Sequence, residues 1–144
     1  MRQLIHRIRN SDKGSVAVEF ALIGPAFIAM FMGILQIGIG MQNYNALRGV
    51  SSDVARYAVV NYQTSNRLSA SQLQDYANGR ASAPPYGLAR TRFSAAINVA
   101  TTQRVAGTTE YTMRLTYRIP SFLGVIGLGE IPLTYSRPIF VVSS

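Results

Sequence analysis

The chain has 144 residues, of which 48% are hydrophobic and 14% are charged, and its formal net charge is +8 at pH 7. This length fits one domain with an appendage and excludes two full hydrophobic cores. Few charges with many apolar residues indicate a membrane component and argue against a disordered basic tail. Cysteine is absent and histidine occurs once, at His6, which excludes disulfides and thiolate metal sites and leaves little for histidine-based catalysis.

The first fourteen residues carry an excess of positive charge. Their charged side chains are Arg2, Arg7, Arg9 and Lys13, against Asp12. The run that follows, from Ser15 to Met41, is apolar apart from Glu19 and Gln36. It is long enough to cross a hydrocarbon core of about 30 Å, which takes about 20 helical residues. Because the basic residues before the run outnumber Arg48 and Arg56 after it, we expect a cytoplasmic N-terminus and an exported C-terminal part.

A cleaved secretory signal peptide is the competing interpretation, since it also has a basic start and an apolar centre. Its apolar region spans about 7 to 15 residues and ends at a small-x-small cleavage site. The run here is longer, contains Glu19 at its start and is followed by no convincing site of that form. The sequence therefore predicts a basic leader at 1–14, a transmembrane helix at 15–41 and an exported domain at 42–144.

One face of the predicted membrane helix carries mostly small residues. They recur at intervals of four, four, three and four and are Pro25, Ala29, Gly33, Gln36 and Gly40. This spacing keeps them within an arc of roughly 80° on a helix. Such a face lets another helix approach closely, and Gln36 could donate a hydrogen bond across the contact. The alternative is that glycine is simply common in membrane helices. Pro25 also predicts a kink or local loosening, because it removes a helical hydrogen bond.

The stretch GSVAVEF at 14–20 places a carboxylate at the mouth of the apolar run. Cleavage between Gly14 and Ser15 would remove the basic leader and leave an α-ammonium four residues before Glu19. Opposite charges attract strongly at low dielectric, whereas either one alone is penalised by desolvation. The ammonium of one subunit could therefore meet Glu19 of a staggered neighbour and fix the axial register. Alternatively, Glu19 reaches the head groups or pairs with Lys13.

The stretch KGSVAVEFALIGPAFIAMFMGILQIG closely resembles the N-terminal signature of TadE-like proteins, the pseudopilins or minor pilins of the tight-adherence (Flp, type IVc) pilus machinery. The matching positions are Gly14, Glu19, Phe20, Pro25 and Gln36. Many members carry Glu where this chain has Gln36, so a charge-based role at that position does not carry over. The resemblance is specific over about residues 13–60.

The resemblance implies processing after Gly14 by a prepilin peptidase, an aspartic membrane protease. It also implies that Glu19, followed by Phe20, acts in recognition or assembly. The implied partners are this peptidase, the major Flp pilin, other minor pilins and an inner-membrane assembly platform. The implied location is the bacterial inner membrane, crossed once, with a periplasmic C-terminal domain. Whether the subunit stays there or enters the extracellular fibre is left open, as is its stoichiometry.

Beyond the membrane, two helical segments are predicted. Apolar residues recur at helical spacing at Leu47, Val50, Val54 and Tyr57. They predict an amphipathic stalk, weakened at Gly49 by roughly 1 kcal/mol relative to Ala. A second helix is expected to begin at Ser69, which forms a capping box with Gln72, and to end near Gly79. Its inward residues would be Leu73, Tyr76 and Ala77. The sequence at 81–87, with paired prolines, predicts a loop.

The C-terminal part predicts three antiparallel strands. The clearest is EYTMRLTYRIP at 110–120, where Tyr111, Met113, Leu115, Tyr117 and Ile119 alternate with polar residues. A strand at about 93–105 should pair with it across a turn near Gly107. A third, at about 131–142, contains Pro138 and therefore belongs at an edge or carries a break. A long helix packed on this small sheet gives an α+β, pilin-like fold.

The sequence holds no catalytic constellation, no metal-binding cluster and no cofactor motif, so we expect an assembly protein and not an enzyme. The leading hypothesis is a minor pilin that helps to initiate or prime a pilus, or couples it to the platform. The alternative is a membrane-anchored protein whose basic exported domain binds DNA or another polyanion through Arg114 and Arg118. An ordinary solvated sheet face explains the same two arginines, and nucleic acid is not expected as a partner. The apolar segment at 122–129 could cap the core, touch the membrane or contact a neighbour.

Overall fold

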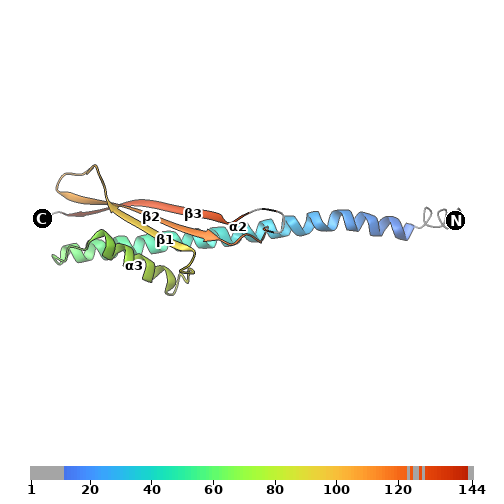
Figure 1. The fold of residues 1–144 in the computed structure, drawn as a ribbon, viewed down its shortest axis with the longest axis horizontal. Helices are drawn as coiled ribbons and strands as arrows, with labels where there is room; N and C mark the ends of the chain where they lie inside the picture. Colours follow the sequence, from blue (N-terminus) through green and yellow to red (C-terminus); the bar gives the residue numbers. More distant parts are fainter. Residues whose placement is uncertain (1–11, 123, 125–126, 128, 143–144) are drawn as a thin grey trace.

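The computed structural model describes residues 12–122, 124, 127 and 129–142. Its elements, in chain order, are α2 (Asp12–Gln63), α3 (Ala70–Ser82), β1 (Phe93–Val99), β2 (Thr108–Ile119) and β3 (Ile131–Val142). Figure 1 shows an elongated molecule in which one half of α2 lies beside the sheet and α3 while the other half extends away alone. This arrangement confirms the predicted α+β class. Most of the predicted leader at 1–14 lies outside the described residues.

Helix α2 is a single helix of 52 residues that continues through Pro25. At a rise of about 1.5 Å per residue, its length is about 78 Å. It contains a segment that is long and apolar enough to cross a membrane, with a mean hydropathy of 2.1 in its most apolar window. The predicted apolar helix and the predicted amphipathic stalk are therefore one continuous element, as expected.

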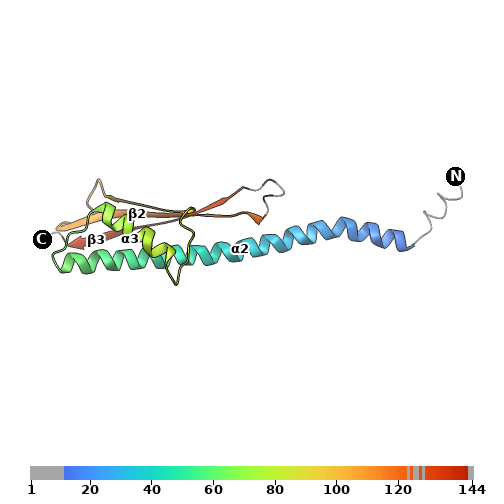
Figure 2. The ribbon, with the colours of Figure 1, turned by 60° about the horizontal axis from the view of Figure 1, so that its bottom comes forward.

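The part of the molecule formed by the sheet, α3 and the second half of α2, which we call the head, has two layers. The sheet has the order β1-β2-β3 and both pairings are antiparallel. Helices α2 and α3 lie side by side on one face of the sheet, and no described element covers the other face (Figures 1 and 2). Helix α2 packs mainly against β3, and α3 packs mainly against β1.

The core lies between these two layers. Helix α2 contributes Leu47, Val50, Val54 and Ala58, and β2 contributes Tyr111, Met113, Leu115, Tyr117 and Ile119. The helical periodicity predicted the buried face of α2, and the strand alternation predicted the buried face of β2. Both patterns are informative because apolar side chains are favoured where they are removed from water. Tyr57 is only partly buried and stacks on Tyr76 of α3, with ring centroids 3.9 Å apart.

Helix α3 starts as predicted but ends later. Ser69 is its N-cap and forms both halves of the capping box with Gln72. The helix does not stop near Gly79 but runs to Ser82, so the loop begins at Ala83 and not at 81. The physical reason is Ala81, which is buried one turn after Ala77 and extends the apolar stripe beyond the glycine.

The strand boundaries are confirmed for β3 and revised for β1. Strand β1 ends at Val99 and not near 105, because the chain beyond it folds into a loop over the end of β2. In this loop the Arg104 amide donates to the Glu110 carboxylate at 3.2 Å, and Gly107 closes the turn at φ +73. Strand β3 pairs only with β2, so Pro138 lies on an edge strand as predicted.

Candidate functional site

The first half of α2 is an apolar rod that contacts little of the head. Its large side chains are mostly exposed, including Phe20 at 77% and Leu22 at 74%. Such an exposed apolar surface is stable in lipid or against other apolar helices, not in water. We call residues 16–35 the free apolar segment. Its 20 residues span about 30 Å, which is the thickness of a bilayer hydrocarbon core.

The residues predicted for processing and assembly lie at the outer end of this rod. The peptide bond between Gly14 and Ser15 lies within the first turns of α2, since the helix begins at Asp12. Glu19 and Phe20 follow on the same helix and are both exposed. The carboxylate of Glu19 is therefore displayed about 6 Å along the axis from Ser15, as an α-helix requires.

The predicted packing face divides into two parts. Pro25, Ala29 and Gly33 lie on the free apolar segment, and a Cβ added at Gly33 would meet no atom within 4 Å. This part of the face is open to another helix and stays a prediction. The same stretch of helix has a shallow apolar hollow that is open to the surroundings, because one helix alone lines it. The residues lining this hollow are Phe20, Ala21, Ile23, Gly24, Pro25, Phe27 and Ile28.

The second part of that face contacts the chain's own head. The Gln36 side chain is 6% exposed, donates from Nε2 to the Pro120 carbonyl at 3.1 Å and accepts from the Phe122 amide at 3.0 Å. In this structure, Gln36 therefore bonds its own β2–β3 turn instead of a neighbouring helix. Gly40 likewise faces Ile119, whose Cδ1 lies 3.7 Å from an added Cβ. No local pattern predicts the contacts of Gln36, because its partners are backbone groups far along the chain.

A polar cluster joins α2 to α3 where the stalk crosses the head. The Asp53 carboxylate accepts from Arg80 Nε at 2.7 Å and from the Tyr86 hydroxyl at 3.1 Å. The hydrogen bond from Arg80 is the main reason that the pKa of Asp53 is lowered, while partial burial opposes it. Burial, followed by the bond to Asp53, raises the pKa of Tyr86. The cluster links α2 to α3 through Arg80 and to the loop after α3 through Tyr86.

Gly49 makes room for this cluster. A Cβ added at Gly49 would lie 2.8 Å from the Tyr86 hydroxyl oxygen and 2.9 Å from its Cζ. The ring cannot move away freely, since its hydroxyl bonds Asp53 and the Arg80 guanidinium lies 5.0 Å from its centroid. The glycine that appeared only to weaken the stalk is thus a site of close packing.

A second ion pair holds the loop between β1 and β2. Glu110 is 3% exposed, and its carboxylate accepts from Arg104 Nε at 2.8 Å and also pairs with the Arg104 Nη2. The hydrogen bond from Arg104 lowers the pKa of Glu110, and the same pair raises the pKa of Arg104. Gln103 accepts from the Glu110 amide at 2.6 Å. Together these contacts close the loop between β1 and β2.

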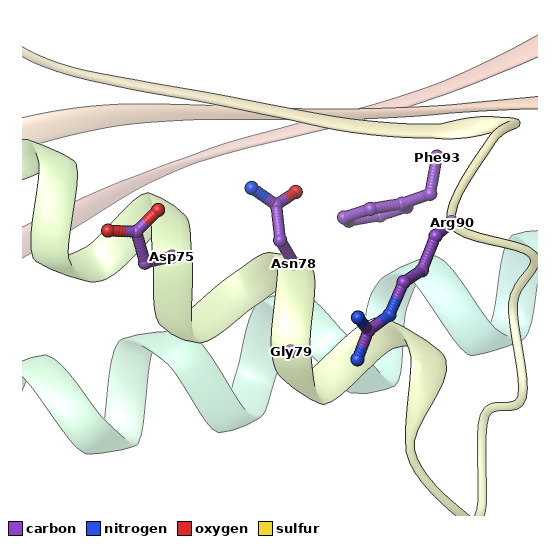
Figure 3. Close-up of a pocket in the computed structure, with 5 residues that line it drawn as sticks. All are labelled: Asp75, Asn78, Gly79, Arg90 and Phe93. Carbon is purple, nitrogen blue, oxygen red and sulfur yellow. The ribbon is translucent and has the colours of Figure 1, made fainter.

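The remaining polar cavity of note lies between α3 and β1 and measures about 490 Å³. Figure 3 shows Asp75 on one side and Arg90 on the other, with Asn78 between them and the Phe93 ring on the same side as Arg90. Arg90 is held by a hydrogen bond from its Nε to Ser82 at 3.0 Å. Among the described residues, the ion pairs are Arg80–Asp53 and Arg104–Glu110, so Asp75 and Arg90 line the cavity without pairing with each other.

The uncovered sheet face carries the two arginines considered for polyanion binding. Arg114 and Arg118 are both exposed, and their cross-strand neighbours are neutral, namely Ala96 and Ser136 for Arg114 and Pro132 for Arg118. Within residues 12–122, 124, 127 and 129–142, no group of three or more His, Cys, Asp or Glu side chains could hold a metal ion.

Comparison with known proteins identifies one related family. Residues 14–56 match the family model described as TadE-like protein. The match begins at Gly14, covers the whole free apolar segment and ends within α2 beside the polar cluster. It confirms the resemblance seen in the sequence. No curated protein and no solved structure matches this chain.

Proposed function

We propose that this protein is a minor pilin or pseudopilin of a bacterial tight-adherence pilus, cleaved after Gly14 by a prepilin peptidase. The observation that carries the proposal is the extent of the family match, which begins at Gly14 and spans the exposed apolar half of α2. TadE-like proteins are structural proteins associated with Tad pilus systems. The chain would take part in initiation or priming of the pilus, or in its coupling to the assembly platform.

The free apolar segment is the part suited to anchoring and lateral assembly. It is about as long as a hydrocarbon core is thick, and its side chains are not used by the head. We infer a single pass through the inner membrane, with the head in the periplasm, before any entry into a fibre. Pro25, Ala29 and Gly33 would form the contact with helices of the major pilin and other minor pilins.

Glu19 is proposed to set the axial register between subunits. Cleavage after Gly14 creates an α-ammonium at Ser15, about one turn before the carboxylate along the same helix. In a bundle of staggered helices, the new ammonium of one subunit reaches Glu19 of the next. Because both charges are costly to hold alone in lipid, their pairing favours the staggered arrangement and disfavours an unprocessed subunit.

The intact mass of the protein isolated from its native membranes tests this proposal. We expect the mature chain to begin at Ser15, with residues 1–14 removed. A chain that keeps its basic leader in cells that assemble pili would overturn the proposal. The alternative function, polyanion capture by the head, predicts an intact leader together with DNA binding that falls steeply with salt concentration.

A further inference from the structure

The end of the head nearest the free apolar segment carries an exposed apolar surface of its own. The exposed fractions of its main side chains are 65% for Ile37, 65% for Met41, 50% for Phe122 and 43% for Ile131. With Tyr44 and Leu133, these residues come from α2, the β2–β3 turn and the start of β3. We call this set the membrane-proximal band.

The band is held at a defined height on α2. The two hydrogen bonds of Gln36 attach Pro120 and Phe122 to the helix at that residue. One turn further on, Ile119 packs over Gly40, and Tyr135 makes an edge contact with Tyr44 at 5.8 Å between centroids. The band therefore covers the stretch of α2 from residue 36 to 44, which rises about 12 Å along the axis.

This height coincides with the outer boundary of a membrane crossed by α2. The apolar run extends from Val16 to Met41, and a hydrocarbon core of about 30 Å takes about 20 of these residues. Every such window ends between residues 35 and 41, which is the level of the Gln36 contact. The head-group layer that follows is about 5–7 Å thick, or about four helical residues, so it reaches the end of the band at residue 44 when the hydrocarbon core ends at residue 40 or 41.

The chemistry of the band suits that layer. From Ile119 to Gly129 the sequence contains no charged residue. Tyrosines are enriched at membrane interfaces, and Tyr44 with Tyr135 lies at the upper edge of the band. Between α2 and β3 there is also a mostly apolar hollow of about 330 Å³, lined by Ile37, Gly40, Met41, Tyr44, Asn45 and Leu133. Of the predicted segment at 122–129, only Phe122, Gly124, Gly127 and Gly129 are described.

We propose that the membrane-proximal band is a lipid-docking surface, which seats the head in the periplasmic leaflet before assembly. Phe122 and Ile131 then lie among the head groups and the ends of the acyl chains closest to them. This inference rests on the proposed membrane anchoring by α2, and its test separates the two. Docking gives the head a fixed height and tilt on the bilayer.

Tryptophan fluorescence tests the docking, because the chain contains no tryptophan. Four single-tryptophan variants of the full chain are reconstituted in phosphatidylcholine vesicles, with or without bromine on the acyl chains. Phe122→Trp reports on the band, Phe27→Trp on the free apolar segment, and Val60→Trp on an exposed position at the far end of α2. Ile131→Trp provides a second reporter in the band.

We expect lipid brominated close to the head group to quench Phe122→Trp and Ile131→Trp, with blue-shifted emission. Lipid brominated deep in the chain should quench Phe27→Trp, and neither lipid should quench Val60→Trp. If Phe27→Trp is quenched while both band reporters emit as in water, docking is wrong and anchoring stands. Blue-shifted but unquenched band reporters mean that a second copy covers the band, which also overturns lipid docking. An unquenched Phe27→Trp refutes the anchoring itself.

Discussion

At the residue scale, Gln36 links α2 to the chain after β2. Its Nε2 donates to the Pro120 carbonyl, which is more than eighty positions away in the sequence. Its amide satisfies a backbone carbonyl and a backbone amide at a site that is almost closed to water. Buried backbone groups without partners are costly. The sequence suggested that Gln36 contacts another helix, whereas in this structure Gln36 attaches the head to α2 of the same chain.

The variant Gln36→Leu keeps the side-chain volume and removes both hydrogen bonds. We expect the free energy of unfolding of the head to fall by about 1–3 kcal/mol, because the Pro120 carbonyl and the Phe122 amide lose their partner. Urea titration of the full chain in detergent, followed by near-ultraviolet circular dichroism, measures this. Gln42→Leu is the matched control, since Gln42 is exposed on the same helix, and should change the value little. Equal effects of the two variants would contradict the role of Gln36.

Gly49 and Gly79, which are two of the helical glycines of the head, should respond in opposite directions to alanine. At Gly49 the added methyl meets the Tyr86 ring, and such overpacking costs about 1–3 kcal/mol. The gain in helix propensity is about 1 kcal/mol, so Gly49→Ala should destabilise by up to about 2 kcal/mol. Gly79→Ala meets no atom within 4 Å and should stabilise by about 0.5–1 kcal/mol. Thermal unfolding of both variants checks the pair of signs, and a more stable Gly49→Ala would refute the steric argument.

At the scale of elements, the contact between α2 and α3 depends on pH through Asp53. Its pKa is lowered in the folded state, chiefly by the hydrogen bond from Arg80. A group with a lowered pKa contributes its full stabilisation above its unfolded value, which is 3.8 for this carboxyl, and loses it as the pH falls through the folded value. Glu110, paired with Arg104, acts in the same direction below its ordinary value of 4.5.

We therefore expect the urea midpoint of the full chain to decrease as the pH is lowered below about 4.5. Asp53→Asn should lower the midpoint at neutral pH and make its dependence on acid pH shallower, because one of the two carboxylates whose pKa folding lowers is gone. Unfolding curves at a series of pH values measure both effects. A variant with the same acid slope as the wild type would show that Asp53 does not titrate with unfolding.

Most elements were predictable from the sequence because their signals are local. Strand β2 alternates strictly, the capping box of α3 lies within four residues, and the apolar run of α2 is continuous. The errors arose where distant groups compete with local patterns. Strand β1 is shorter than predicted because Arg104 and Glu110 close a loop after it. Helix α3 is longer than predicted because Ala81 is buried in the core.

In the candidate site, too, local features were predictable and tertiary contacts were not. Gly14, Glu19 and Phe20 could be singled out because their spacing along one helix is fixed by the sequence. The contacts of Gln36 and the close packing of Gly49 against Tyr86 depend on the tertiary fold, which no local pattern contains.

For the whole molecule, the central question is how subunits find their register. Glu19→Ala removes the charge proposed to meet the Ser15 ammonium. We expect the variant to be inserted in the membrane but to support fewer pili than the wild type, because the staggered arrangement loses its ion pair. Asp75→Ala is the control, since that carboxylate is exposed on α3, outside both the free apolar segment and the membrane-proximal band.

Pili counted by electron microscopy in cells that produce each variant, with the intact mass of the subunit, measure the effect. Wild-type numbers of pili with processed Glu19→Ala subunits would refute the charge-pairing mechanism and leave the family match untouched.

Helix α2 enters the head without a linker, because the same 52-residue helix forms both the free apolar segment and the stalk. No break in the helix separates the free apolar segment, which other subunits would contact, from the part of α2 that packs against the sheet. A rotation of the free apolar segment about the helix axis therefore turns the head by the same angle. A shift of this segment along the axis moves the head by the same distance. In a filament of such subunits, the packing of the α2 helices would therefore determine the orientation of every sheet.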